Sequence, residues 1–252
     1  MKISRRGMVI GAGAACIAGA ALFGLLTQFG GEAPSSAAGV SVCLKADIPF
    51  VEGATKRCYT PAEAAALADR PVLDEQNQHV RISLSHPTDL ERGLETAGTC
   101  AEYRTLKNAG WYALSTREMR REAVFERACG VIAMLEQAQP AEVSYFENDA
   151  LSKADLRSLS DHARFGFGPE DDRPGGGVEI STLGDGVWLI AEGDQRARIE
   201  EIAHADFTTD GRADMLVFVT VSVKDGTATA SRVGLLDKPA ATGPVMFVER
   251  EK

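Results

Sequence analysis

The sequence predicts an α+β fold in which a disulfide-stapled helical hairpin layer packs on a C-terminal antiparallel β-meander. Three observations predict it. Apolar residues recur at helical spacing within 60–160, whereas from residue 178 onward they alternate with polar residues. The expected strands are joined by short connections, which favour antiparallel neighbours. Four cysteines lie after residue 38, and an even count in an exported chain favours disulfides.

Helices are expected after three cap signals, each a Ser or Thr followed three residues later by an acid. These are Thr60 with Glu63, Thr99 with Glu102, and Ser152 with Asp155. The second signal opens a helix over about 100–109, and a longer helix is expected over about 116–139, before Pro140. One strand, over about 79–85, is expected to interrupt the helices.

The two helices that flank the turn at 110–115 are expected to form an antiparallel hairpin. Cys100 and Cys129 then lie at the same level, so we predict a disulfide between them. This leaves Cys43 with Cys58, which close a short loop at the N-terminus of the body. In the loop-entropy model each closure stabilises the fold by about 3–4 kcal/mol. Metal binding by these cysteines is disfavoured, because the sequence has no C-x-x-C pair.

The C-terminal half has the period of strands. Strands are expected at 178–183, 187–192, 196–205, 214–223, 227–236 and 245–249. Turns at 184–186 and 225–226 join neighbouring strands. The strand at 214–223 is the most apolar of the set, so we expect it at the centre of the sheet.

The chain is expected to have four parts. They are an export segment at 1–38, a mostly helical half at 39–165, a loop of glycines and acids at 166–177 and the strand half at 178–252. The two halves are expected to share one domain, because a body of this length can bury one good core.

Residues 1–38 have the organisation of an export signal: a basic head, an uncharged run over 7–26 and a stretch of small residues. Ser4, Arg5 and Arg6, followed by apolar residues, resemble the start of a twin-arginine signal peptide. The resemblance implies export of the body to the periplasm or the extracellular space.

Three outcomes of processing are open for this segment. Cleavage after Ala38 would release the body. An uncleaved anchor is the first alternative, because the uncharged residues 7–26 can just span a bilayer and would leave the body facing the periplasm. Lipidation of Cys16 is the second.

The net charge of the chain disfavours anionic partners. The whole chain carries −9, and the residues after 38 carry −11 from 24 basic and 35 acidic side chains. This sign disfavours nucleic acid and anionic membrane surfaces as partners. A protein or small-molecule partner in the cell envelope is expected instead, with membrane contact only through residues 7–26 if the signal is retained.

One loop, at 206–214, carries a pattern of metal ligands. Its expected ligands are the side chains of Asp206, Thr208, Asp210 and Asp214 and the carbonyl of Arg212. This loop resembles the calcium loops of FG-GAP repeats and, more distantly, of EF-hands, in which oxygens alternate around a glycine. The resemblance implies a weak structural calcium site, because Thr208 stands where those families have an acid or amide. The alternative is a plain turn whose Asp206 and Asp214 accept backbone hydrogen bonds.

Catalytic signatures such as G-x-S-x-G, H-E-x-x-H and G-x-x-x-x-G-K do not occur in the sequence. We therefore predict an exported cell-envelope binding or scaffolding protein without catalytic activity. The alternative is a small exported hydrolase whose site is assembled from residues distant in sequence. A cleft that gathers His86 or His162 with residues 170–172 would favour the hydrolase, whereas an exposed apolar patch without convergent titratable groups would favour partner binding.

Overall fold

The computed structural model describes residues 42–88, 93–162, 177–224, 226 and 229–249. The chain divides into two units, Met1–Ala37 and Ala38–Lys252, and only the second contains described residues. The predicted export segment and nearly all of the predicted loop at 166–177 lie outside these ranges. Within them, no helix combines the length and apolar character needed to cross a membrane.

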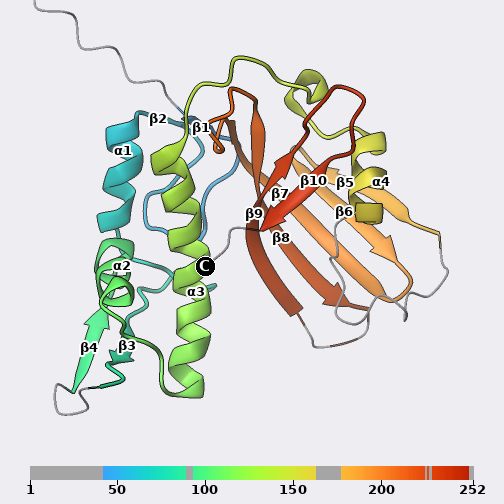
Figure 1. The fold of residues 1–252 in the computed structure, drawn as a ribbon. Coiled ribbons are helices and arrows are strands. Elements are labelled where there is room, and N and C mark those ends of the chain that lie inside the picture. The colour runs from blue at the N-terminus through green and yellow to red at the C-terminus, as the bar shows by residue number, and fades with distance from the viewer. Residues whose placement is uncertain (1–41, 89–92, 163–176, 225, 227–228, 250–252) are drawn as a thin grey trace, which may run out of the picture. The chain divides into compact units, whose positions relative to one another are not determined.

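The predicted α+β fold is confirmed, with helices covering both faces of an antiparallel sheet (Figure 1). The sheet contains β1 (Val42–Leu44), β2 (Cys58–Tyr59), β5 (Glu179–Gly184), β6 (Val187–Glu192), β7 (Gln195–Ala205), β8 (Asp214–Val223), β9 (Thr229–Asp237) and β10 (Met246–Glu249). The helices are α1 (Pro61–Ala66), α2 (Cys100–Asn108), α3 (Thr116–Gln137) and α4 (Lys153–His162), with short 3-10 turns η1 (Leu67–Asp69) and η3 (Glu147–Asp149). A separate hairpin is formed by β3 (Ile82–Ser85) and β4 (Leu94–Ala97).

The strands from β5 to β10 follow one another as the predicted antiparallel meander. One edge of β7 pairs with β8, and its other edge is shared by two strands. Residues 195–200 of β7 pair with β6, whereas residues 203–204 pair with β1, which in turn pairs with β2. The sequence does not predict β1 and β2, because strands of three and two residues are too short to show a period.

The apolar strand β8 lies between β7 and β9, in the interior of the sheet as predicted. Val217 and Val219 on one face belong to the same core cluster as Leu159 of α4. Leu216 on the other face belongs to a second cluster that includes Ile132 of α3. The strand is therefore buried on both faces, which explains why its sequence is apolar with little alternation.

The helical hairpin of α2 and α3 is closed by the predicted disulfide between Cys100 and Cys129, whose Cα atoms lie 5.2 Å apart. Both cysteines are buried. Arg104 of α2 adds a bidentate ion pair with Glu136 of α3, at 2.7 and 2.8 Å. The disulfide and the ion pair thus join the same two helices at different levels.

Helix α3 ends two residues earlier than predicted, at Gln137. A proline disfavours helical backbone at the residue before it, and Gln139 precedes Pro140. The N–H and C=O of Gln139 instead bond the C=O and N–H of Asp206, at 2.9 and 3.0 Å. The chain that leaves α3 is thereby tied to the predicted metal loop.

The predicted strand at 79–85 forms only over Ile82–Ser85, where it pairs with β4. Its earlier residues bond elsewhere: Val80 donates its N–H to the carbonyl of Val72 at 2.8 Å. The sequence gives no sign of β4, because the first three of its four residues are exposed and carry no apolar alternation.

A buried ion pair connects α4 to the chain that follows β9. The Lys238 ammonium lies 2.7 Å from Asp155 Oδ1, and both side chains are less than a tenth exposed. Asp155 Oδ2 also accepts hydrogen bonds from the N–H and hydroxyl of Ser152, which completes the predicted helix cap. Burial disfavours the charged carboxylate, but the bonds from Lys238 and Ser152 outweigh it and lower the pKa of Asp155.

Candidate functional site: a pocket beside the 206–214 loop

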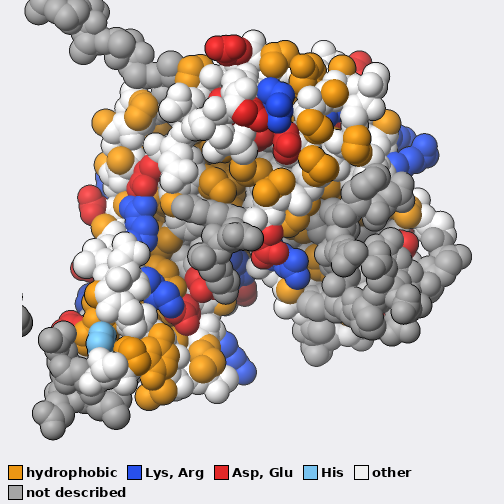
Figure 2. Space-filling model, viewed as in Figure 1, with side chains coloured by type: hydrophobic (Ala, Val, Ile, Leu, Met, Phe, Trp, Pro, Cys, Tyr) orange, Lys and Arg blue, Asp and Glu red, His pale blue; other side chains and the backbone are white. Residues whose placement is uncertain are grey.

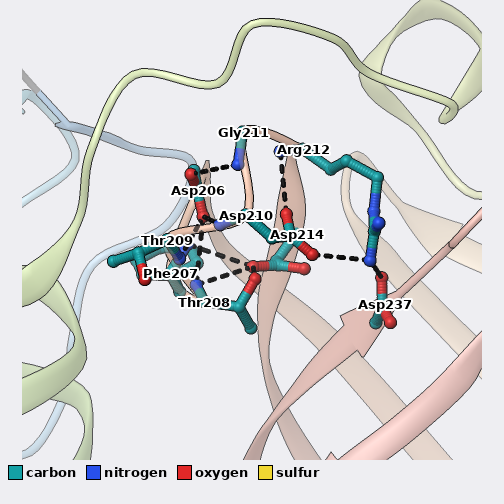
Figure 3. Close-up of polar contacts among 9 residues, drawn as sticks. All are labelled: Asp206, Phe207, Thr208, Thr209, Asp210, Gly211, Arg212, Asp214 and Asp237. Atoms are coloured by element: carbon teal, nitrogen blue, oxygen red, sulfur yellow. Dashed lines mark hydrogen bonds and ion pairs between the residues drawn. The ribbon is translucent and has the colours of Figure 1, made fainter.

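The carboxylate of Asp206 organises the 206–214 loop (Figure 3). Its Oδ1 accepts the N–H groups of Thr208, Thr209 and Asp210 at 3.1, 2.6 and 3.3 Å. Its Oδ2 accepts the N–H of Gly211 at 2.8 Å. One side chain therefore satisfies four successive backbone donors of the turn, which stabilises a conformation in which Thr209 and Gly211 have positive φ.

Asp214 closes the loop from the start of β8 and is fully buried. Its Oδ2 accepts the N–H of Phe207 at 3.0 Å, the N–H of Thr208 at 3.2 Å and the hydroxyl of Thr208 at 3.1 Å. Its Oδ1 has no hydrogen-bond partner among the described residues. Burial raises the pKa of Asp214 to about 6, and the negative charges of Asp237 and Asp210 add to the rise.

Arg212 supplies positive charge beside these carboxylates. Its N–H bonds Asp210 Oδ1 at 2.9 Å, and its Nη2 pairs with Asp210 Oδ2 at 2.5 Å. The same Nη2 lies 3.7 Å from Asp237 Oδ1 on β9 (Figure 3). The predicted ligand is the carbonyl of Arg212, which these contacts leave untested. The guanidinium of the same residue balances the acids Asp210 and Asp237.

The five predicted calcium ligands thus lie in one loop, with Asp206 and Asp214 facing backbone amides. These are the hydrogen bonds that the plain-turn alternative predicts. In the described part of the chain, no group of three or more His, Cys, Asp or Glu side chains is arranged to hold a metal ion. Calcium at this loop stays a prediction that a binding measurement has to test.

A pocket of about 370 Å³ lies beside the loop. Its lining comes from β1 and the residue that follows it, from the 139–144 segment and from the ends of β7 and the loop: Cys43, Lys45, Gln139, Pro140, Ala141, Glu142, Val143, Ser144, His204, Ala205 and Ala213. Charged and polar side chains therefore share the lining with apolar ones.

The 206–214 loop holds one wall of the pocket in place. Glu142 donates its N–H to the carbonyl of Gly211 at 2.8 Å, and Ala213 donates its N–H to the carbonyl of Val143 at 2.8 Å. The 139–144 segment is therefore bonded to the loop that Asp206 organises. A substitution that alters the conformation of the loop is therefore expected to move the 139–144 wall of the pocket as well.

A β-bulge in β7 places Glu201 and His204 on the same face of the sheet. Side chains three residues apart on a regular strand point to opposite faces, but the pairing of β7 with β8 shifts its register around Ile202. Glu201 Oε1 consequently lies 3.3 Å from His204 Nε2, in a largely buried pair. The His204 ring also packs near that of Phe146, with centroids 5.6 Å apart.

Three neighbouring strands present Cys58, Cys43 and His204 in one row across the sheet. Cys43 of β1 is directly opposite Cys58 of β2 and directly opposite His204 of β7. Directly opposite residues of antiparallel strands share a face. The predicted disulfide between Cys43 and Cys58 forms here, and Cys43 and His204 both line the pocket.

The residues that the sequence offered for a hydrolase cleft do not line this pocket. His86 lies beside Trp111, with ring centroids 5.5 Å apart, and its Nδ1 is 3.2 Å from the hydroxyl of Thr88. Residues 170–172 and the side chain of His162 lie outside the described part. Sequence reasoning missed His204 as a site residue, because its pairing with Glu201 depends on a bulge that no motif marks.

Exposed apolar side chains occur at the α2–α3 turn and in the β3–β4 hairpin, where Figure 2 shows hydrophobic side chains gathered. They include Leu94, Leu114 and Met119, which are 66%, 60% and 53% exposed. Leu114 precedes the α3 cap residue Ser115 and Met119 lies in the first turn, the positions of a hydrophobic staple. A local role at the start of α3 therefore accounts for two of the three.

No protein-family model, curated protein or solved structure matches this chain. A functional conclusion therefore rests on the geometry and chemistry of the site.

Proposed function

We propose that the chain is an exported cell-envelope binding protein whose pocket beside the 206–214 loop takes a small polar ligand without chemical change. The observation that carries this proposal is the pocket itself. Its volume of about 370 Å³ falls in the range of small-ligand sites, about 300–1,000 Å³. The surrounding wall is held by backbone bonds rather than by loose side chains, so little ordering cost is expected on binding.

The lining chemistry favours a ligand that carries both signs of charge. Lys45 offers an ammonium and Glu142 a carboxylate, while His204 can donate or accept. Ala141 and Ala205 leave room for an apolar portion. A free amino acid or the end of a short peptide fits this combination.

The two disulfides support the cellular location, because such bonds persist in oxidising compartments. Export through the segment at 1–38, by the twin-arginine route that its residues resemble, is part of the proposal. The body would then act in the periplasm or outside the cell.

Native mass spectrometry of protein recovered from the periplasm tests the binding function. We expect a retained adduct of small-molecule mass on part of the wild-type population. Ala141→Trp, which fills the pocket from a half-buried wall position, should lose the adduct. Ala62→Trp, on an exposed face of α1, is the matched control and should keep it. An adduct that survives Ala141→Trp would place binding elsewhere.

One observation favours a hydrolase as a second candidate. Ser144 lines the same pocket as His204, and the bulge aligns Glu201 with that histidine. A hydroxyl, an imidazole and a carboxylate are the groups of a nucleophilic triad, which is defined by geometry rather than by sequence order. These residues come from the 139–144 segment and β7, as a site assembled from sequence-distant residues would require.

A fluorophosphonate probe separates the two candidates, because it labels activated serines. The hydrolase predicts labelling of Ser144 that is lost in Ser144→Ala and in His204→Gln and kept in Ser181→Ala, an exposed serine of β5. If the wild-type protein is not labelled, the hydrolase candidate is wrong and only the binding function remains.

A further inference from the structure

We propose that the Cys43–Cys58 disulfide is a site of thiol–disulfide exchange, in which Cys43 is the leaving sulfur and His204 stabilises its thiolate. The reaction partner is a reduced thiol of the envelope, on a protein or a small molecule. The proposal goes beyond ligand binding and does not depend on the ligand of the pocket.

The two disulfides differ sharply in exposure. Cys43 and Cys58 are exposed, whereas Cys100 is 0% and Cys129 is 5% exposed. Exchange requires a thiolate to approach a sulfur, so access governs which bond reacts. The second disulfide is therefore an internal reference for a buried, structural bond.

His204 is directly opposite Cys43 on β7, on the side of β1 away from Cys58. Such pairs have Cβ atoms about 4.5–5.5 Å apart, which brings an imidazole within reach of the sulfur. The Glu201 carboxylate, 3.3 Å from His204 Nε2, orients the ring. A protonated imidazole beside a cysteine stabilises its thiolate.

Positive charge also favours Cys43 over Cys58 as the leaving sulfur. Lys45 follows Cys43 by two residues on the same chain, and both line the pocket. Arg57 adjoins Cys58, but its guanidinium is paired with Glu63 at 3.0 Å. Among the described residues no ion pair forms with Lys45, so its ammonium charge is available on the Cys43 side.

The exchange then takes place in two steps. A thiolate attacks the sulfur of Cys58, a new S–S bond forms to Cys58, and the Cys43–Cys58 bond breaks with its electron pair on Cys43. A second thiolate attacks the incoming sulfur of this mixed disulfide and releases Cys58. Two electrons pass to the protein, the partner thiols become a disulfide, and their protons end on Cys43 and Cys58.

Oxidised protein purified from the periplasm tests the proposal. It is incubated with graded reduced glutathione, quenched with iodoacetamide and mapped by peptide mass spectrometry. We expect glutathione on Cys58 together with alkylated Cys43, while Cys100 and Cys129 stay bonded. Glutathione found mainly on Cys43 would overturn the assignment of the leaving sulfur.

Two variants test the neighbours of Cys43. His204→Gln and Lys45→Met should each slow the appearance of the adduct by about threefold or more, because a poorer leaving thiolate departs more slowly. His79→Gln, an exposed histidine outside the pocket, is the control and should react at the wild-type rate. Continued protection of Cys100 and Cys129 shows that each variant is folded. Equal reactivity of the two disulfides, or unchanged rates in both test variants, would overturn the proposal.

Discussion

Lys238 and Asp155 form a 2.7 Å ion pair in which both side chains are less than a tenth exposed. Taking these two charges out of water is costly, and their contact offsets that cost only while both are present. The pair connects α4 to the chain after β9. Its loss should therefore destabilise the packing of α4 on the sheet face that this helix covers.

Lys238→Ala should therefore lower the free energy of unfolding by about 3–5 kcal/mol, because Asp155 is left as an uncompensated buried charge. Urea denaturation measures the change. Lys153→Ala, on the exposed start of the same helix, is the control and should change stability by less than about 0.5 kcal/mol. Similar midpoints for the two variants would show that the pair contributes little.

Asp214 should make the protein more stable in mild acid than at neutral pH. Burial raises its pKa from 3.8 to about 6, so the folded state takes up a proton. The stabilising contribution is then fully present below about pH 3.8 and is lost as the pH rises through about 6.

Asp214→Asn, which is neutral at every pH, isolates this effect. The variant should be more stable than wild type by about 2 kcal/mol at pH 7.5, and the difference should vanish near pH 4. Urea midpoints across this range provide the measurement. A difference that does not change with pH would mean that Asp214 titrates normally.

Calcium at the 206–214 loop should raise the thermal midpoint in millimolar calcium relative to chelator. We expect a Kd in the range of about 0.1–1 mM, because Thr208 replaces an acid. Calcium at a hundredfold excess over Kd would add about 2.7 kcal/mol. Asp210→Ala removes one predicted ligand and should abolish the calcium-dependent shift.

That variant also loses the Asp210–Arg212 pair, so each protein is compared with itself in the two buffers. Identical wild-type midpoints with calcium and with chelator would leave only the turn, whose Asp206 and Asp214 already bond backbone amides.

Replacing Arg5 and Arg6 with lysine should trap the precursor in the cytoplasm, because the twin-arginine pattern depends on both arginines. Fractionation followed by immunoblotting measures the result. Normal export of the double variant would indicate the general secretory route or a simple anchor.

The sequence predicts the regular elements well where local chemistry decides them. Thr99 accepts the N–H of Glu102 at the start of α2, as its cap pattern indicates. Cys100 and Cys129 pair because two capped helices fix their levels in the hairpin. These features follow from residues close together in the chain, so a pattern can reveal them.

The pocket follows from contacts that leave no local pattern. It requires β1 to add to the free end of β7, a bulge around Ile202 to turn His204 toward Glu201, and the 139–144 segment to bond the loop. Each depends on register between distant segments. A change of one residue in register would turn His204 to the opposite face.

The pairing of β1 with β7 has a consequence for biosynthesis. Cys43 follows closely on the proposed export signal, yet its partner His204 comes late in the chain. Nearly all of the body must therefore emerge from the ribosome before β1 can pair with β7. Such long-range strand pairing requires both segments to have been synthesised. In a truncated chain that lacks β7, β1 would have only β2 as a partner strand. The complete pairing of β1 thus requires that synthesis has passed β7.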